Sequence, residues 1–163
     1  MHYRVRSLDS EGLRQAFSLV QAVHPRLSLE RWRRFARPNV ERRRRAAQGP
    51  RRGILSLEDQ RGCILALFAF RVEPDLIHGC LLHCEYLAAV DLLNPRQALR
   101  VLIEAIRQRA RLTGCGAIRV ATPRTLAALA DELSLSGFAG DGVNYALAMD
   151  PGRRLSAAIG GSA

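Results

Sequence analysis

A long apolar segment that leads directly into a helical pattern limits the folds open to this chain more than any other feature. Residues 79–90 have the length and composition of a buried β-strand, and a helical pattern starts within residues 91–100. The first backbone N–H groups of a helix lack partners, and the helix dipole adds partial positive charge there. A strand that ends at such a start therefore creates a site for an anion, such as a phosphate group. This order of elements suggests a cofactor-binding fold.

The N-terminal part of the sequence predicts one strand and two helices. Alternating residues at 3–7 indicate the strand. Asp9 or Ser10 is placed to cap a first helix with apolar residues at helical spacing. Ser28 is placed to cap a second helix, which we expect to break near Pro38, because proline disfavours helix before it.

The middle of the sequence predicts an antiparallel meander of three strands. Short segments rich in glycine, proline and aspartate separate the strand patterns and are typical of turns. The expected strands are residues 53–58, 63–72 and 79–90, with turns at 59–62 and 73–75.

The remaining segments predict a helix, a strand, a helix and a strand. The first of these helices buries one apolar face and stops near Gly114, and a strand follows at 117–121. Pro123 opens the next helix, and the last strand is expected at 143–149. The stripes expected to be buried are Leu99, Leu102, Ile103, Ile106 and Ala110 in the first helix, and Leu126, Leu129, Ala130 and Leu133 in the second.

Length and hydropathy indicate a single domain without a membrane span. The 163 residues suit one domain, which we expect to cover 1–150, with 151–163 as a flexible tail. No apolar stretch reaches the ~18 residues that cross a bilayer, and the first residues lack a signal-peptide core. We therefore expect a cytoplasmic protein.

The basic residues and the cysteines of the chain exclude several kinds of catalytic site. All 25 basic residues are arginines, so a Schiff-base lysine, a pyridoxal-phosphate lysine and a P-loop lysine are excluded. On a strand, Cys80 and Cys84 face one way and His83 the other, so the three do not share a metal. We interpret all four cysteines as reduced thiols, with Cys80 and Cys84 as buried apolar side chains, and predict no metal site.

An arginine-rich segment carries most of the net positive charge of the chain. Residues 26–52 contain eleven arginines against two glutamates, and the formal net charge is +10. The arginines from Arg31 to Arg45 fit an anionic partner: an acidic acceptor, nucleic acid phosphates or an anionic membrane surface. The alternative is a solvated basic face. The spacing of Trp32 and Phe35 suits a buried helix face better than stacking on bases.

The order of strand, two helices, meander, helix, strand, helix and strand resembles the GCN5-related N-acetyltransferase (GNAT) superfamily. The most specific matches are Leu87-Ala88-Ala89-Val90 before a helix, Gly114-Cys115-Gly116 before a strand, and Gly137-Phe138 before the last strand. The resemblance covers residues 3 to about 150. It implies an α/β fold with a mixed, mostly antiparallel sheet, a central splayed parallel strand pair and flanking helices.

The resemblance also implies a cofactor, acetyl-CoA or another acyl-CoA, held between strands 79–90 and 117–121. Backbone groups from Leu87 to Val90 would pair with its pantetheine arm, and N–H groups between Arg96 and Arg100 would hold its pyrophosphate. The residues implied in cofactor binding are Leu87, Ala88, Ala89, Val90, Arg96, Gln97, Ala98, Leu99 and Arg100.

The chain departs from the family pattern at two places. The family loop reads Arg/Gln-x-x-Gly-x-Gly/Ala, but here Pro95 takes the basic position, and Ala98 and Arg100 take the glycine positions. Arg100 would either obstruct the diphosphate or clamp it. The usual acid of the family is a tyrosine, and Leu133 occupies its position.

Three residues are candidates for proton transfer. Glu85 is a carboxylate within an apolar strand, which fits a general base, or else a rim residue paired with an arginine. His83 shares its face and is the alternative base, or a structural histidine. Tyr145 is a replacement acid from the last strand, or ordinary aromatic packing. Cys84 as an acyl-carrying nucleophile is less favoured than a buried inert thiol.

The leading interpretation is an acyl-CoA-dependent acyltransferase, a GNAT-type N-acetyltransferase, that acts on a small-molecule or protein amine of acidic character. One alternative is a GNAT-like module that has lost catalysis and serves in binding or regulation. Another is an arginine-rich binder of nucleic acid or of a membrane surface on the same scaffold.

Overall fold

The computed structural model describes residues 3–40, 50–90, 95–121 and 127–140. In these ranges the chain forms the elements β1 (Arg4–Ser7), α1 (Gly12–Val23), α2 (Leu29–Val40), β2 (Arg52–Glu58), β3 (Ile64–Asp75), β4 (Gly79–Ala89), α3 (Pro95–Leu112), β5 (Ala117–Val120) and α4 (Ala127–Leu135). The predictions that lie outside the described residues concern the arginine run 42–45, Pro123, Leu126, the strand 143–149 with Tyr145, and the tail 151–163.

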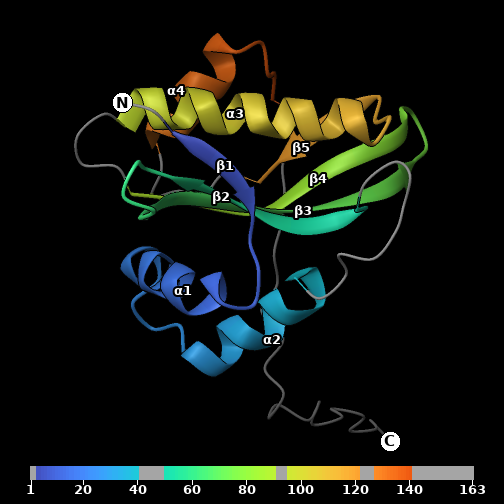
Figure 1. Cartoon of the computed structure of the whole chain (residues 1–163). Helices are drawn as coiled ribbons and strands as arrows, with labels where there is room; N and C mark the ends of the chain where they lie inside the picture. The colour runs from blue at the N-terminus through green and yellow to red at the C-terminus, as the bar shows by residue number, and fades with distance from the viewer. Residues whose placement is uncertain (1–2, 41–49, 91–94, 122–126, 141–163) are drawn as a thin grey trace, which may run out of the picture.

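The five strands form one mixed sheet in the order β1-β2-β3-β4-β5. Neighbouring strands are antiparallel except for β4 and β5, which are parallel and joined by the crossover helix α3. Helices α1 and α2 cover one face of the sheet, and α3 and α4 cover the other (Figure 1). This arrangement confirms the predicted mixed, mostly antiparallel sheet with a parallel pair and flanking helices.

Both predicted helix caps on the N-terminal side form. Asp9 Oδ1 accepts a hydrogen bond from the Gly12 N–H at 2.8 Å, and Ser28 Oγ accepts one from the Arg31 N–H at 3.2 Å. The prediction that the second helix breaks near Pro38 is wrong, because α2 continues to Val40. A proline so close to the helix end removes a single hydrogen bond, which the helix tolerates.

The predicted turn at 73–75 is also wrong, because these residues belong to β3. The turn follows at 76–78, where Asp75 Oδ1 accepts hydrogen bonds from the N–H groups of Ile77 and His78 at 3.0 and 2.9 Å. An aspartate that bonds the backbone two and three residues onward stabilises a tight turn without proline. The β3–β4 hairpin is therefore longer than the sequence indicated.

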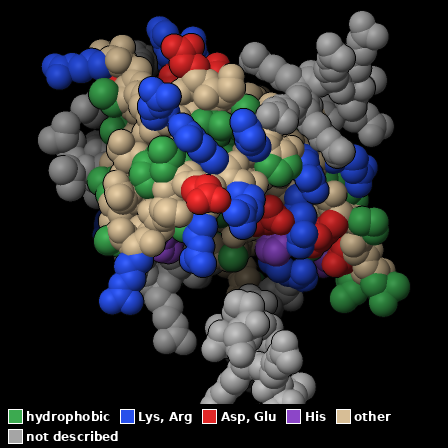
Figure 2. Space-filling model, turned by 90° about the horizontal axis from the view of Figure 1, so that it is seen from below, with side chains coloured by type: hydrophobic (Ala, Val, Ile, Leu, Met, Phe, Trp, Pro, Cys, Tyr) green, Lys and Arg blue, Asp and Glu red, His purple; other side chains and the backbone are tan. Residues whose placement is uncertain are grey.

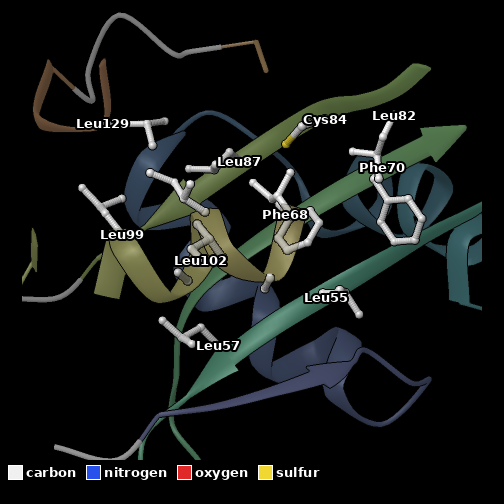
Figure 3. Packing of buried hydrophobic residues seen from close by; sticks show 14 of the residues in the cluster. Leu55, Leu57, Phe68, Phe70, Leu82, Cys84, Leu87, Leu99, Leu102 and Leu129 are labelled. Atoms are coloured by element: carbon white, nitrogen blue, oxygen red, sulfur yellow. The ribbon is translucent and has the colours of Figure 1, made fainter. Parts of the chain in front are cut away.

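The larger apolar core lies between the sheet and helices α3 and α4. The predicted stripe of α3 is buried in full, together with Leu129 and Leu133 of α4, whereas Ala130 is exposed, contrary to the prediction. Figure 3 shows Leu129 beside Leu87 and Leu99 in this core. The core includes Leu55, Leu57, Phe68, Phe70, Leu82, Cys84, Leu87, Leu99, Leu102, Ile103, Ile106, Leu129 and Leu133.

A second core lies between the sheet and helices α1 and α2. Trp32 is buried, and its Nε1–H donates a hydrogen bond to the Leu13 carbonyl oxygen at 2.8 Å, which ties α2 to α1. Phe35 is 36% exposed, so the prediction of a buried face holds for Trp32 and fails for Phe35. The core includes Leu8, Ala16, Leu19, Val20, Trp32, Ala36, Ile54, Leu67, Ala69 and Ala88.

A tight approach of two backbones fixes the start of the parallel strand pair. The Gly116 N–H donates to the Cys80 carbonyl oxygen at 2.9 Å. A Cβ on Gly116 would lie 2.7 Å from the His78 carbonyl oxygen, so only glycine fits without a shift. Beside this contact the Sγ atoms of Cys80 and Cys115 lie 3.3 Å apart. The pair is therefore closed at this end.

Candidate functional site

Strand β5 is paired with β4 over its whole described length, and β4 continues beyond the end of β5. They pair over Leu81–Cys84 and Ala117–Val120, and the last described contact is the Ala121 N–H to the Cys84 carbonyl oxygen at 3.2 Å. Strand β4 continues to Ala89, still paired with β3 on its other side. Among the described residues, β4 from Glu85 onward has no β5 partner, because β5 ends at Val120; whether the pair is splayed stays a prediction.

A β-bulge lies where the pairing of β4 with β5 ends. Cys84 pairs with Phe70 and Tyr86 pairs with Ala69, so Glu85 has no opposite residue in β3. Cys84 packs in the core under α3, and Tyr86 packs against the core under α1 and α2. The extra residue shifts the alternation of side chains by one position, as bulges do. Glu85 and Tyr86 therefore both point to the α1 and α2 side of β4, where the Glu85 carboxylate contacts Arg71.

Some backbone N–H and carbonyl groups of β4 beyond the end of β5 point away from β3. The Val90 N–H donates to the Leu65 carbonyl oxygen of the β3 side at 2.7 Å. Because successive peptide groups of an antiparallel strand point in opposite directions, those of Leu87 and Ala89 point away from β3. Their N–H and carbonyl groups are available to an extended ligand that would take the place of a strand.

Helix α3 begins close to this open edge, since only residues 90–94 connect β4 to it. Arg96 and Gln97 are exposed, whereas the side chains of Ala98 and Leu99 are buried in the core. The first backbone N–H groups of a helix have no partner within the helix, so the anion site at this turn stays a prediction. The predicted cofactor-binding residues thus group at one end of the sheet.

Arg100 belongs to an ion pair that the sequence did not reveal. Its Nε donates to Glu132 Oε2 at 2.9 Å, and Glu132 is 2% exposed on α4. The two terminal nitrogens of Arg100 have no hydrogen-bond partner among the described residues. Glu132 therefore fixes the guanidinium while its outer donors stay open to a ligand.

The two candidate bases lie in one charged cluster on β3 and β4. Arg71 Nε lies 2.9 Å from Glu73 Oε2 and 3.0 Å from Glu85 Oε1. His83 Nδ1 lies 3.6 Å from Glu73 Oε1 and has no hydrogen-bond partner among the described residues. The side chain of Glu85 is 25% exposed, so water reaches it. Glu85 is paired with an arginine, and this pairing is compatible with a base that acts through water.

Two other positions weighed from the sequence lie in the core. Cys84 is fully buried, and burial raises the pKa of its thiol to about 12, so it is not a thiolate nucleophile at neutral pH. Leu133, a residue of α4, packs in the core between the sheet and helices α3 and α4. No group of three or more histidine, cysteine or acidic side chains within the described ranges is arranged to hold a metal.

A cavity of about 440 Å³ opens on the α1 and α2 side of β4. We call it the aromatic cavity. The Tyr86 ring centroid lies 5.7 Å from that of His24 and 6.1 Å from that of Phe35. The residues that line it include Arg26, Leu27, Arg31, Trp32, Phe35 and Tyr86. Regular alternation would place Tyr86 on the opposite face from Glu85, and the bulge that changes this has no signal in the residue pattern, so the cavity was not predicted.

Tyr86 presents a polar atom inside this apolar wall. Its hydroxyl is buried and has no hydrogen-bond partner among the described residues. Burial raises the pKa of Tyr86 to about 12, so the hydroxyl stays protonated at neutral pH. A ligand that enters the cavity would find a hydrogen-bonding group that the protein leaves unused.

A second, larger cavity of about 690 Å³ lies between the start of α1 and the end of α2. We call it the arginine cavity, because Arg14, Arg33 and Arg37 line it together with Glu11. Arg31, on another side of α2, lines the aromatic cavity instead. Arginine side chains are spread over the whole face seen from α1 and α2 (Figure 2). The described arginines of the arginine-rich segment are thus exposed.

The fold is that of known acetyltransferases. The aminoglycoside N-acetyltransferase AAC(6')-Iy, in complex with a CoA bisubstrate analogue, superposes with a TM-score of 0.72 at 14% identity, over 92% of this chain and 100% of that chain. Ribosomal-protein-alanine N-acetyltransferase from Brucella melitensis gives 0.70 at 12% identity, over 91% and 100%. A transcriptional regulator from Bacillus halodurans gives 0.73 at 13% identity, also over 91% and 100%.

No protein-family model matches the sequence, and no curated protein matches it. At these identities the superpositions show the fold alone: the chain has the fold of GNAT acetyltransferases, as the sequence resemblance implied. Within the described ranges, no helix combines the length and the apolar character that crossing a membrane needs.

Proposed function

We propose that this protein is an acyl-CoA-dependent N-acyltransferase. The observation that carries the proposal is the edge of β4 beyond the end of β5, where the N–H and carbonyl groups of Leu87 and Ala89 point away from β3 and have no strand partner among the described residues. AAC(6')-Iy, which shares the fold, was crystallised with CoA and with a CoA bisubstrate analogue. An extended amide chain that ends in a diphosphate matches this edge and the start of α3.

The residues at this edge would share the binding of the cofactor. Leu87 and Ala89 would hydrogen-bond the pantetheine amides, whereas the Val90 N–H is already bonded to Leu65. Arg96, Gln97 and Ala98 would offer N–H groups to the diphosphate. Arg100, held in place by Glu132, would add its two outer nitrogens as a clamp.

A bound acyl-CoA supplies an activated thioester, and the protein supplies proton transfer. Glu85 lies at the bulge beside the open edge and would accept the proton of the acceptor amine, directly or through water. Arg71 holds the Glu85 carboxylate in one orientation. His83 is the alternative base, and Tyr145, outside the described residues, stays the predicted proton donor to the thiolate.

The cofactor step is tested by thermal unfolding with CoA. At a concentration of 100 times Kd, a ligand that binds only the folded state adds about 2.7 kcal/mol, or a rise in Tm of roughly 5–10 °C for a chain of this size. Ala89→Pro removes an N–H that faces the open edge and leaves the β3 hydrogen bonds intact, so it should fold and lose the rise. Ala89→Val keeps the N–H and is the control. No rise at millimolar CoA would refute the proposal.

A binding or regulatory module without catalysis is the second candidate, and two observations favour it. Leu133 is buried in the core where the family acid would stand. A protein of the same fold is named a transcriptional regulator, so the fold does not fix the activity. A rise in Tm with CoA, combined with no thiol release from acetyl-CoA across a broad panel of amines, would favour this candidate.

A further inference from the structure

We propose that the aromatic cavity selects the acceptor, and that the acceptor is a hydrophobic α-amino acid with a free amine and a free carboxylate. This inference rests on the proposed function, because it names the substrate that the same site would acylate. It depends on three features of the cavity: its apolar walls, its two arginines and the place of Tyr86 directly after Glu85 in β4.

The walls of the cavity suit an aromatic or branched apolar side chain. Trp32, Phe35 and Tyr86 form a continuous series of rings, with centroids 6.1 Å apart between Trp32 and Phe35 and also between Phe35 and Tyr86. Leu27 and Val20 complete the apolar lining. Rings at these distances favour a further ring or a branched aliphatic group by edge and offset contacts.

The size of the cavity points to a small molecule. Its volume of about 440 Å³ is within the range of roughly 300–1,000 Å³ that is typical of small-ligand sites. A ligand in the cavity would cover the solvent-exposed part of the Phe35 ring. Large exposed rings often mark binding sites.

The charge at the cavity favours a carboxylate and disfavours a polycation. Arg26 and Arg31 both line it, and neither has an ion-pair partner within the described ranges. The described residues that line the aromatic cavity include no carboxylate, in contrast to the arginine cavity with its Glu11. An arginine binds a carboxylate through paired N–H groups, and the net charge of +10 repels polyamines.

The position of Tyr86 connects the cavity to the reaction. Tyr86 lies between Glu85 and Leu87 in β4, so a ligand against its ring contacts the strand that carries the candidate base, although Glu85 itself does not line the cavity. The buried Tyr86 hydroxyl would hydrogen-bond the carboxylate or the amine. An α-amine is one bond away from the carbon that carries both the carboxylate and the apolar side chain, which matches the adjacent positions of Glu85 and Tyr86 in β4.

The transfer is balanced without a further reactant. The acceptor nitrogen forms a bond to the acyl carbon, and the bond from that carbon to the CoA sulfur breaks. The amine proton passes to Glu85, directly or through water, and the thiolate takes up one proton to leave as free CoA thiol. The products are an N-acyl amino acid and CoA.

The first experiment measures CoA thiol release from acetyl-CoA with four acceptors. L-Phenylalanine has the ring and the carboxylate, phenethylamine lacks the carboxylate, L-alanine lacks the ring, and spermidine is a polycation. We expect kcat/KM to be about 10- to 100-fold higher for L-phenylalanine than for phenethylamine, the range of a charged hydrogen bond. Equal or faster turnover of phenethylamine or spermidine would overturn the inference.

Two matched variants locate the selectivity. Arg31→Gln removes a guanidinium from the aromatic cavity, and Arg33→Gln removes one from the arginine cavity on the same helix. The ratio of kcat/KM for L-phenylalanine over phenethylamine should fall about tenfold in Arg31→Gln and stay unchanged in Arg33→Gln. An unchanged ratio in Arg31→Gln and in the double variant Arg26→Gln/Arg31→Gln would also overturn the inference.

A binding experiment judges the cavity independently of the cofactor. Trp32 is the single tryptophan of the chain and lines the cavity, so its fluorescence reports on occupancy. L-Phenylalanine should change this emission at a concentration at least tenfold lower than phenethylamine does. If CoA gives no rise in Tm, the proposed function fails. The titration still shows whether the cavity binds L-phenylalanine in preference to phenethylamine. No change in emission with L-phenylalanine, with or without CoA, would refute the acceptor assignment alone.

Discussion

The two faces of the sheet are built differently although they share every strand. On the α3 and α4 face, large side chains such as Phe68, Leu102 and Ile106 are fully buried, and the acidic Glu132 is buried with its arginine partner. On the α1 and α2 face, two cavities open and Phe35 is partly exposed. The first face supports the fold, and the second leaves its apolar and charged groups available for binding.

The arginines show the same contrast. On α3, Arg100 pairs with Glu132, Arg111 pairs with Glu104, and Arg109 lies over the Phe70 ring at 5.3 Å. On α2, Arg31 and Arg33 have no ion-pair partner among the described residues and line the two cavities. These arginines of α3 contribute to the packing of their face, whereas on α2 Arg34 pairs with Glu30 and Arg31 and Arg33 remain without an ion pair within the described ranges.

The largest difference between the faces should appear in stability. Leu102→Ala deletes a fully buried side chain from the tightly packed face and should lower the free energy of unfolding by about 3 kcal/mol or more. Leu27→Ala, at the wall of the aromatic cavity, should lower it by about 1 kcal/mol or less, because the side chain is only partly buried. Urea unfolding measures both, and equal losses would remove the contrast.

The next largest effect concerns turnover on the binding face. Glu85→Gln should slow acyl transfer at least about 100-fold, equivalent to about 2.7 kcal/mol, and should leave the rise in Tm with CoA intact. Glu73→Gln is the matched control, since Glu73 contacts the same Arg71 at 2.9 Å. A comparable loss in both variants would assign the effect to the charged cluster and not to Glu85 as the base.

Arg100 connects the packed face to the cofactor site. Arg100→Ala leaves the buried Glu132 carboxylate unpaired and should lower the free energy of unfolding by about 2 kcal/mol. The double variant Arg100→Ala/Glu132→Leu should recover that stability, because no buried charge remains. Weak CoA binding that persists in the stable double variant would identify Arg100 as a clamp, and normal CoA binding would contradict that role.

The smallest effect is a loss of stability at alkaline pH. Each face contributes one buried group that ionises at high pH, the Cys84 thiol on one face and the Tyr86 hydroxyl on the other. Burial raises the pKa of Cys84 from 9.0 and that of Tyr86 from 10.0, each to about 12. The unfolded chain ionises first, so this contribution is complete below pH 9 and is lost progressively between pH 9 and 12. The chain has no lysine that titrates in this window.

Single variants separate the two contributions. Tyr86→Phe should remove the part of the decline that starts near pH 10, and Cys84→Ala the part that starts near pH 9. The free energy of unfolding, measured by urea at several pH values, gives both slopes. A decline that neither variant reduces would show that other groups control the alkaline limit.

Periodicity predicted the elements well, because burial on one face repeats along a helix or strand. The stripe from Leu99 to Ala110 was identified from spacing alone and is buried in full. The errors at Pro38 and Pro74 share one cause. Proline was taken as a breaker, but near the end of a helix or strand it costs at most one hydrogen bond, and the neighbouring residues decide where the element stops.

The candidate site was only partly predictable, because its parts come from distant segments. Glu85 and His83 stand out as polar residues in an apolar strand. Glu132 resembles an ordinary surface glutamate, and its partner lies 32 residues earlier in the chain. The aromatic cavity combines Trp32 and Phe35 with Tyr86, and the face of Tyr86 depends on a bulge that residue patterns do not reveal.

The unpaired Glu85 also makes β4 sensitive to the number of its residues, beyond their identity. If the same residues were paired without the bulge, Tyr86 would enter the core beneath α3 and Leu87 would point to the cavity. Deleting Glu85 would also remove the bulge, but Tyr86 would still face the cavity and Leu87 would still lie in the core. A chain that loses this one residue would keep the wall of the cavity and give up the place where a carboxylate stands next to the ring.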